Sequence, residues 1–312
     1  MALVLGIDTS NYTTSCALYD TESNSVVQRK QLLPVKFGEC GIRQSDAVFH
    51  HTKQLPQLVE SLFSECCARP DVVCASLTPR RQEGSYMPCF TVGGGVGRSI
   101  AASLAIPFYD ASHQQGHIVA ALFSAQKLSL LKEKFLAFHV SGGTTEAIMV
   151  TPDEKDILSC EIVGKTLDLN AGQLIDRVGV MLGLQFPCGK ELEILAENCN
   201  EKIKVKPVLK GTDCCLSGFE NKLTDLYKKT NDKSLVAATT LAYAEATISA
   251  MTHAVFDEYG KTPVVYAGGV MSNKIIRKSL EEKFDCSFAQ PEFSCDNAAG
   301  VAVLGGIRYS EK

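Results

Sequence analysis

Short apolar runs alternate with small polar turns and amphipathic stretches along most of the chain. Residues 2–8 (ALVLGID) are an apolar run ending in Asp8, which predicts a buried strand. A polar turn follows, and residues 16–20 (CALYD) predict a second strand. The same plan returns at 135–150, where FLAFHV, the turn SGGT and EAIMV follow one another. The organisation is therefore predicted to be doubled, although the two copies share little sequence.

The other predicted elements alternate in the same way. A helix is expected from about Ser45, which is a plausible N-cap. Further strands are expected at 71–77, 106–110 and 263–270, further helices within 164–183, 232–258, 272–284 and 296–309, and a glycine-rich loop entering a helix at 93–105. Alternating strands and helices indicate an α/β fold, and 312 residues suffice for two lobes.

Composition narrows the class of protein. The formal charge is −4, so a nucleic-acid ligand would need a local basic patch or a partner; the best patches are Arg80–Arg81 and 202–210 (KIKVKPVLK). Such short runs are more often simply solvated faces. Thirteen scattered cysteines without C-x-x-C spacing indicate a reducing compartment. The N-terminus lacks a positive n-region and no apolar run approaches ~20 residues, so we expect a cytoplasmic protein that does not enter a membrane.

Three glycine or small-residue turns follow predicted strands. They are GIDTS, VSGGT and AGGV, and such turns can present backbone N–H groups to a phosphate. Gly142, Gly143, Gly268 and Gly269 would let the backbone approach a ligand closely. Three turns in one context favour a two-lobed nucleotide-binding fold. The Walker lysine pattern is missing, and we interpret 92–97 (VGGGVG) as a packing feature.

His113 and His117 stand four residues apart where a helix is predicted. Two imidazoles at this spacing share a helix face and can bind one metal. Hydrolytic zinc helices carry a glutamate after the first histidine, but here Gln114 stands there and cannot act as a base. Asp296 and His139 are candidates for a third ligand. The adjacent His50 and His51 are interpreted as surface or cap residues, and His253 as structural.

Carboxylates surround a further turn at 187–189 (PCG). Asp168, Asp176 and Glu193 are candidates for holding a hydroxyl-rich group such as ribose. Solvated helix positions are an equally good interpretation of Asp176 and its neighbour Arg177.

These motifs together resemble one family. GIDTS, HQQGH, VSGGT, GKTLDLNAGQLID, LGLQFPCG, LSGF, AGGVMSNKIIR and SCDNAAG occur in family order along nearly the whole chain. The chain is similar to the tRNA N6-threonylcarbamoyladenosine synthases (TsaD-type), formerly called O-sialoglycoprotein endopeptidases of the peptidase M22-like glycoprotease type. The resemblance implies the ASKHA fold of actin, sugar kinases and heat-shock ATPases, with two similar lobes and a nucleotide cleft. Lobes are then expected at 1–110 and 111–295, with the helix in 296–312 packing back on the first.

The resemblance also implies an activity and a site. Family members transfer a threonylcarbamoyl group from threonylcarbamoyl-AMP to N6 of the adenosine next to the anticodon of tRNA. It implies one divalent metal, Fe²⁺ or Zn²⁺, acting as a Lewis acid. No catalytic residue is assigned beyond the metal site. The implied metal ligands are His113, His117 and Asp296, with His139 as a possible addition. The implied substrate or nucleotide contacts are His139, Val140, Ser141, Gly142, Gly143, Asp176, Gly189, Glu193, Gly268, Gly269 and Asn273.

The resemblance further implies partners: tRNA, a same-fold subunit without activity, and a small ATPase, in a homo- or heterodimer. Departures from the family pattern leave alternatives open. Residues 11–13 lack the family's cysteine and acidic pair, 78–95 replace its Arg-Gly-Pro-Gly loop, and DLNAGQ lacks two carboxylates. These changes indicate a diverged bacterial paralogue. The alternatives are a carbamoyl- or phosphoryl-transferase with a small acceptor, and a nucleotide-binding scaffold subunit.

Overall fold

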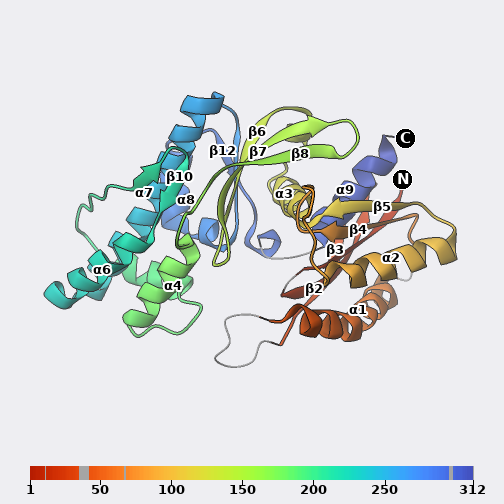
Figure 1. Cartoon of the computed structure of the whole chain (residues 1–312), viewed down its shortest axis with the longest axis horizontal. Helices are drawn as coiled ribbons and strands as arrows, with labels where there is room; N and C mark the ends of the chain where they lie inside the picture. Colours follow the sequence, from red (N-terminus) through yellow and green to blue (C-terminus); the bar gives the residue numbers. More distant parts are fainter. Residues whose placement is uncertain (11, 35–41, 67, 295–297, 312) are drawn as a thin grey trace. The chain divides into compact units, whose positions relative to one another are not determined.

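The computed structural model contains two compact units. It describes residues 1–10, 12–34, 42–66, 68–294 and 298–311, and Figure 1 follows the chain through its elements. Unit 1 comprises Met1–Leu131, Pro152–Cys160 and Glu292–Lys312. Unit 2 comprises Lys132–Thr151 and Glu161–Pro291. The expected lobe boundary at 110/111 stays a prediction; the helix that carries His113 lies in unit 1.

Unit 1 is built on a mixed five-stranded sheet in the order β3-β2-β1-β4-β5. β1 pairs antiparallel with β2 and β2 with β3, whereas β4 pairs parallel with β1 and β5 with β4. The strands are β1 (Leu3–Thr9), β2 (Thr13–Asp20), β3 (Ser25–Leu32), β4 (Val72–Thr78) and β5 (Phe108–Ser112). The apolar run at 2–8 is thus the central strand β1, and the run at 71–77 is its buried parallel neighbour β4.

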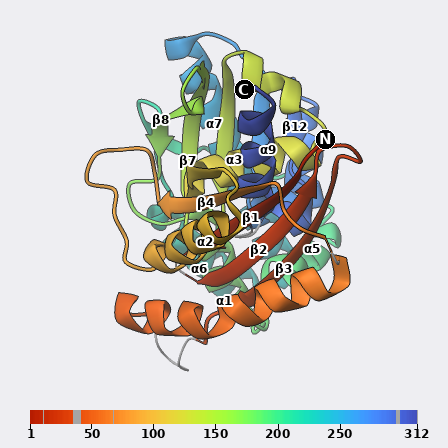
Figure 2. The ribbon, with the colours of Figure 1, turned by 90° about the vertical axis from the view of Figure 1, so that its right-hand side faces the viewer.

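Helices pack on this sheet, and Figure 2 shows the sheet with α1 and α2 beside it. The helices are α1 (Gln44–Cys66), α2 (Phe90–Leu104), α3 (His113–Ser124) and α9 (Ala299–Ser310). Leu5 and Ile7 of β1 share one hydrophobic cluster with residues of α1 and α2. Side chains alternate along a strand, so Val4, Gly6 and Asp8 point to the other face. There, a side chain at Gly6 would collide with Ala302 of α9.

Unit 2 repeats the strand plan with its sheet in the order β12-β11-β6-β7-β8. β6 pairs antiparallel with β7 and parallel with β11, and β11 pairs parallel with β12. The strands are β6 (Phe135–Val140), β7 (Thr145–Asp153), β8 (Ile157–Lys165), β11 (Val264–Ala267) and β12 (Cys286–Phe288). The doubling predicted from the sequence is therefore confirmed as two sheets of matching strand order.

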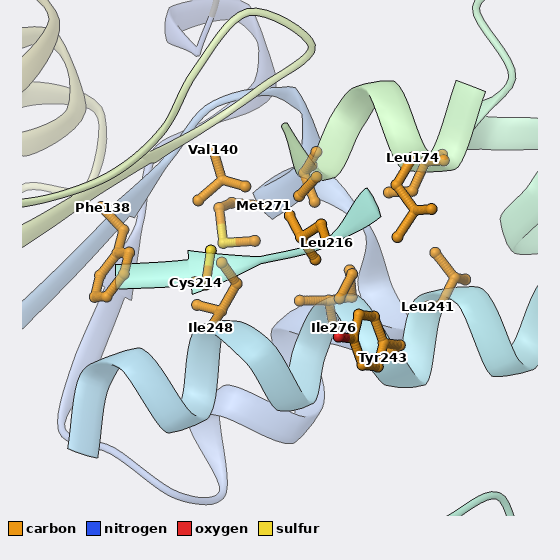
Figure 3. Packing of buried hydrophobic residues seen from close by; sticks show 14 of the residues in the cluster. Phe138, Val140, Leu174, Cys214, Leu216, Leu241, Tyr243, Ile248, Met271 and Ile276 are labelled. Atoms are coloured by element: carbon orange, nitrogen blue, oxygen red, sulfur yellow. The ribbon is translucent and has the colours of Figure 1, made fainter. Parts of the chain in front are cut away.

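The core of unit 2 forms around the helix α7 (Lys233–Tyr259), whose buried residues include Leu241, Tyr243 and Ile248. Figure 3 shows these side chains in one cluster with Phe138 and Val140 of β6, with Ile248 nearest to them. The remaining elements are α4 (Ala171–Met181), α5 (Gly189–Glu197), α6 (Ser217–Thr230), α8 (Lys274–Glu281) and the hairpin β9 (Val208–Lys210) and β10 (Asp213–Cys215). Among the described residues, no helix is long and apolar enough to span a bilayer.

A glycine-rich loop entering a helix was expected at 93–105, and the helix is present, but it begins earlier: the glycines at 93–97 already lie within α2. Gly93 and Gly97 let the helix approach the sheet: a Cβ on Gly93 would lie 2.8 Å from the Thr9 hydroxyl, and one on Gly97 would lie 3.1 Å from the Phe108 ring. Close packing therefore offsets the entropic cost of glycine in a helix. The interpretation of 92–97 as a packing feature rather than a ligand loop agrees with this geometry.

Candidate functional site

The predicted metal helix begins at His113, directly after β5. Ser112 is its N-cap, and Ser112 and Gln115 form a reciprocal capping box. The Gln115 backbone N–H donates to Ser112 Oγ at 3.2 Å, and the Ser112 N–H donates to Gln115 Oε1 at 2.9 Å. This box fixes the first turn of α3, in which His113 is the first residue and His117 lies one turn further on.

Asp8 orients the first histidine. Its carboxylate is fully buried, and its Oδ1 lies 3.0 Å from His113 Nδ1. Ser76 Oγ of β4 donates to the same oxygen. If the Nδ1 proton of His113 points to Asp8, the Nε2 lone pair of His113 points away from the carboxylate. The apolar strand ending in Asp8 was recognised from the sequence, but this contact with His113 was not.

The two histidines converge. Their Nε2 atoms lie 2.9 Å apart, within hydrogen-bond distance, and their ring centroids lie 4.3 Å apart. Two nitrogens bound to one ion at about 2.1 Å and at angles near 90–110° are separated by about 3.0–3.4 Å. The observed 2.9 Å is slightly shorter, so a small rotation of the two rings would let the pair hold a divalent metal. The Asp8–His113 contact is the carboxylate–histidine support typical of such sites.

The third ligand is not given by the described residues. Asp296 lies outside them, and among them no group of three or more histidine, cysteine or carboxylate side chains is placed to hold a metal. His139 lies on β6 in unit 2, in register with Glu146 and Ala267. Its role as an added ligand stays a prediction.

Gln115 connects three parts of unit 1, a role that the sequence did not indicate. Its amide nitrogen donates to the carbonyls of Asp156 (3.3 Å) and Leu158 (3.0 Å), and its oxygen accepts from Arg81 Nε at 3.2 Å. Arg81 in turn pairs with Asp110 at 2.5 Å. The segment at 78–95 that departs from the family pattern is thereby tied to the start of α3.

Two of the predicted glycine turns lie side by side in unit 2, because β6 and β11 are neighbouring strands. Gly268 has φ of 101°, and a Cβ there would lie 2.2 Å from the carbonyl oxygen of Val140. In contrast, a Cβ on Gly142, Gly143 or Gly269 would meet nothing within 4 Å. Gly268 thus serves the packing of the two turns, while the other three leave space for a ligand.

Ser141 shapes the first of these turns. Its hydroxyl accepts hydrogen bonds from the N–H groups of Gly143 and Thr144 at 3.2 and 3.1 Å. The N-terminus of α4 lies against this turn, since Gly172 N donates to the Ser141 carbonyl at 3.2 Å. The N–H groups of Ala171 and Gly172 are thus used within the fold, by Thr145 Oγ1 and the Ser141 carbonyl, and the helix N-terminus contributes its partial positive charge beside the exposed glycines.

Three of the predicted nucleotide contacts, Asp176, Glu193 and Asn273, each accept a hydrogen bond from a backbone N–H group. Asp176 Oδ1 accepts from Cys188 N at 2.8 Å, beside Gly189. Glu193 Oε2 accepts from Lys274 N at 3.2 Å, and Asn273 Oδ1 caps α8 through Ile275 N and Ile276 N. These bonds bring α4, α5 and α8 together around the PCG turn within unit 2.

Asp168 instead joins the segment before α4 to the start of α6. Its oxygens accept from Leu216 N at 2.8 Å, and from Ser217 N and Ser217 Oγ at 3.2 and 2.5 Å. Burial alone raises the pKa of Asp168, but the hydrogen bonds from Ser217, Leu216 and Leu169 outweigh it and hold the pKa below its ordinary value. This carboxylate therefore serves the fold.

The interpretation of His51 as a surface or cap residue is wrong. It is fully buried, and its Nδ1 lies 2.7 Å from the hydroxyl of Thr14, which also donates to Gln54 Oε1 at 2.7 Å. Burial lowers the pKa of His51 and favours the neutral ring. His253 has the expected structural role, with its ring 4.9 Å from that of Phe284.

Solved structures of similar fold define the class of protein. Full-length HypF in its phosphate- and nucleotide-bound form matches with a TM-score of 0.59 at 14% identity, over 99% of this chain and 46% of that chain. A ROK-family glucokinase from Streptomyces griseus matches with a TM-score of 0.55 at 9% identity, over 98% and 99%. With two mixed five-stranded sheets, the chain has the ASKHA fold.

The sequence then places the chain within that class. The family description "tRNA N6-adenosine threonylcarbamoyltransferase" (TsaD) matches residues 23–303. A protein of that name from Thermus thermophilus is 32% identical over 98% of this chain and 93% of its own. One from Chlorobium chlorochromatii is 28% identical over 99% and 93%. The chain belongs to the TsaD family of tRNA N6-adenosine threonylcarbamoyltransferases.

Proposed function

We propose that this protein transfers a threonylcarbamoyl group from threonylcarbamoyl-AMP to N6 of the adenosine next to the anticodon of tRNA. The observation that carries the proposal is the convergence of His113 and His117 behind a buried Asp8, within a chain of the TsaD family. A scaffold subunit has no need of two imidazoles supported in this way.

In the reaction, the N6 nitrogen attacks the carbamoyl carbon. The new C–N bond forms as the C–O bond to the phosphate breaks, AMP leaves, and the N6 proton is lost. A divalent ion, when bound, would polarise the donor as a Lewis acid. His113 and His117 would hold it, and Asp296 is the proposed third ligand. Asp8 would keep the His113 Nε2 lone pair available for the ion.

The open glycines of unit 2 are proposed to bind the phosphate of the adenylate. Gly142, Gly143 and Gly269 have space for a ligand, and the N-terminus of α4 adds favourable partial charge. Gln114 lies beside His113 and is no base, so this helix does not provide the hydrolytic water activation of a zinc peptidase. A glutamine at this position suits transfer to an amine, because a base that activates water would favour hydrolysis of the donor.

The test is direct incubation of the full chain with threonylcarbamoyl-AMP, unmodified tRNA and the partner proteins that the family implies, followed by mass spectrometry of the nucleosides. We expect threonylcarbamoyladenosine with the wild-type protein and its loss with His113→Ala. A His253→Ala variant is the control, since the ring of this histidine contacts Phe284 within unit 2 and His253 is not one of the proposed ligands. Absence of the modified nucleoside with every partner present would refute the proposal.

A second candidate is a related transferase with a small acceptor. It is favoured by the segment at 78–95, where Arg81 and Pro79 fix a loop unlike the family's on α3 through Gln115 Oε1 and Gln114 N. Turnover of the adenylate that needs no tRNA, with a carbamoylated small amine as product, would favour this candidate over the first.

A further inference from the structure

Exposed lysines recur at every second position of the segment between α5 and β9. Lys202, Lys204 and Lys206 are exposed, and Lys210 continues the series after the exposed Val208. The intervening Ile203, Val205, Pro207 and Leu209 are partly buried. Alternation of this kind is typical of extended backbone, and we call residues 202–210 the lysine strip. Its last three residues form β9, and Figure 1 labels β10, the strand paired with them.

The inward side chains hold the strip against unit 2. Val205 and Leu209 pack against the core cluster, and Ile203 borders a cavity of about 280 Å³ together with Ala238 and Leu241 of α7. At its end, β9 pairs with β10, whose Cys215 carbonyl accepts from Tyr243 Oη at 3.2 Å. Because the backbone is already anchored, ordering the lysines costs little backbone entropy on binding.

The positive charges of the lysine strip are available to a ligand. In the described part of the chain, none of its four lysines forms an ion pair, and the nearby Glu245 is already paired with Lys283 at 2.7 Å. Asp213 lies opposite Lys210 in the hairpin register and offsets part of its charge. The net charge of the whole chain is −4, so the positive charge of the strip is a local feature and not part of an overall basic character.

The spacing selects the kind of partner. Alternate residues of an extended chain lie about 6.6 Å apart, so the ammonium groups form a row rather than converging on one point. A row of like charges fits a polymer with regularly repeated negative charges better than a single phosphate or carboxylate. We propose that the lysine strip binds the phosphate backbone of an RNA strand; for tRNA as the RNA, this inference rests on the proposed function.

The test measures tRNA binding by the full chain as a function of salt. Replacing Lys202, Lys204 and Lys206 by glutamine should reduce the slope of log K against log salt by about 2–3 and weaken binding about tenfold near 0.1 M salt. The triple arginine variant should keep the slope, because the charges remain. A matched control replaces Lys222, Lys228 and Lys229 of α6, which are also exposed, and should change the slope little.

Each other outcome overturns the inference. These are an unchanged slope in the glutamine variant, an equal fall in the α6 control, no salt-dependent tRNA binding by the wild-type chain, or lysine-dependent capture by phosphatidylserine vesicles in place of RNA. Nucleoside analysis of the same mixtures separates this inference from the proposed function. If the glutamine variant binds tRNA as the wild type does and still transfers the group, only the inference about the strip is refuted. If tRNA binding depends on the strip but no threonylcarbamoyladenosine forms, only the proposed reaction is refuted.

Discussion

Asp8 is the residue on which the candidate metal site most depends. Its place on β1 follows from alternation: Leu5 and Ile7 face α1 and α2, which leaves Asp8 on the opposite face, where its Oδ1 reaches His113 Nδ1. The sequence showed the acid at the end of an apolar strand. It did not show the contact, because 105 residues separate the two positions and the pairing depends on tertiary packing.

We predict that Asp8→Asn weakens binding of Co²⁺ or Zn²⁺ about 10–100-fold, because the support of His113 is lost. Competition titration with a chromophoric chelator, together with the Co²⁺ absorption spectrum, measures this without reference to activity. Asp257→Asn, an exposed change on α7, is the control. Equal affinities for the wild type and Asp8→Asn would show that Asp8 does not orient a ligand.

Two adjacent glycines provide a second test at the residue scale. Gly268→Ala should lower the free energy of unfolding by about 2–4 kcal/mol, because its Cβ would overlap the Val140 carbonyl at a positive φ. Gly269→Ala should be near neutral for stability, since its Cβ meets nothing within 4 Å. Urea denaturation of both variants checks the difference, and equal losses would contradict the assignment of Gly268 to packing.

At the scale of elements, the start of α3 is held by a side chain that no local pattern identifies. Gln115 is buried, and it joins the capping box to Arg81, to the turn between β7 and β8 and to the start of β8. The sequence pattern singles out Gln114, because it replaces the glutamate base of zinc peptidases. The structural importance of Gln115 arises instead from its hydrogen bonds to the backbone carbonyls at 156 and 158. Contacts between residues far apart in the sequence leave no periodic pattern of apolar and polar residues.

Gln115→Glu should destabilise the protein by about 1–3 kcal/mol, because two carbonyls lose their donor and face a carboxylate. Thermal unfolding monitored by circular dichroism measures the effect. Gln114→Glu introduces the same charge one residue earlier, where the backbone N–H donates to Pro79, and should cost less. A larger loss in Gln114→Glu would contradict the network.

The contact between Asp168 and α6 predicts a pH dependence. The folded-state pKa of Asp168 is lowered, so its contribution to stability is present above the unfolded pKa and is lost as pH falls through the folded pKa. Asp168→Asn should therefore be less stable than the wild type at pH 7, and the gap should narrow toward pH 3. Urea unfolding at both pH values tests this, with the exposed Asp225→Asn as control.

At the scale of the whole molecule, the α/β class, the doubled strand plan and most element positions were predictable from apolar runs. The helical state of the glycines at 93–97 was not, because glycine favours loops locally and only packing against β1 and β5 justifies a helix there. The place of one short segment was equally hidden. Pro152–Cys160 belongs to unit 1 although the strands on either side belong largely to the other sheet.

Buried thiols give a probe of each unit. Burial raises the pKa of Cys16 and Cys74 in unit 1, and of Cys214 in unit 2, to about 12. At pH 8 in the native state we expect these three to resist alkylation, while the partly exposed Cys199 reacts. Peptide mass spectrometry across a urea series then reports when each core opens. Native-state labelling of Cys74 would contradict the burial described above.

The placement of α9 has a consequence for how the protein is made. Gly6 of β1 and Ala302 of α9 are in close contact, yet all of unit 2 is synthesised between them. On the ribosome, the side of β1 at Gly6 must therefore wait for its helix until α9 emerges. The second sheet can complete its own core earlier. Nascent chains arrested before residue 299 should thus be the ones that chaperones hold longest.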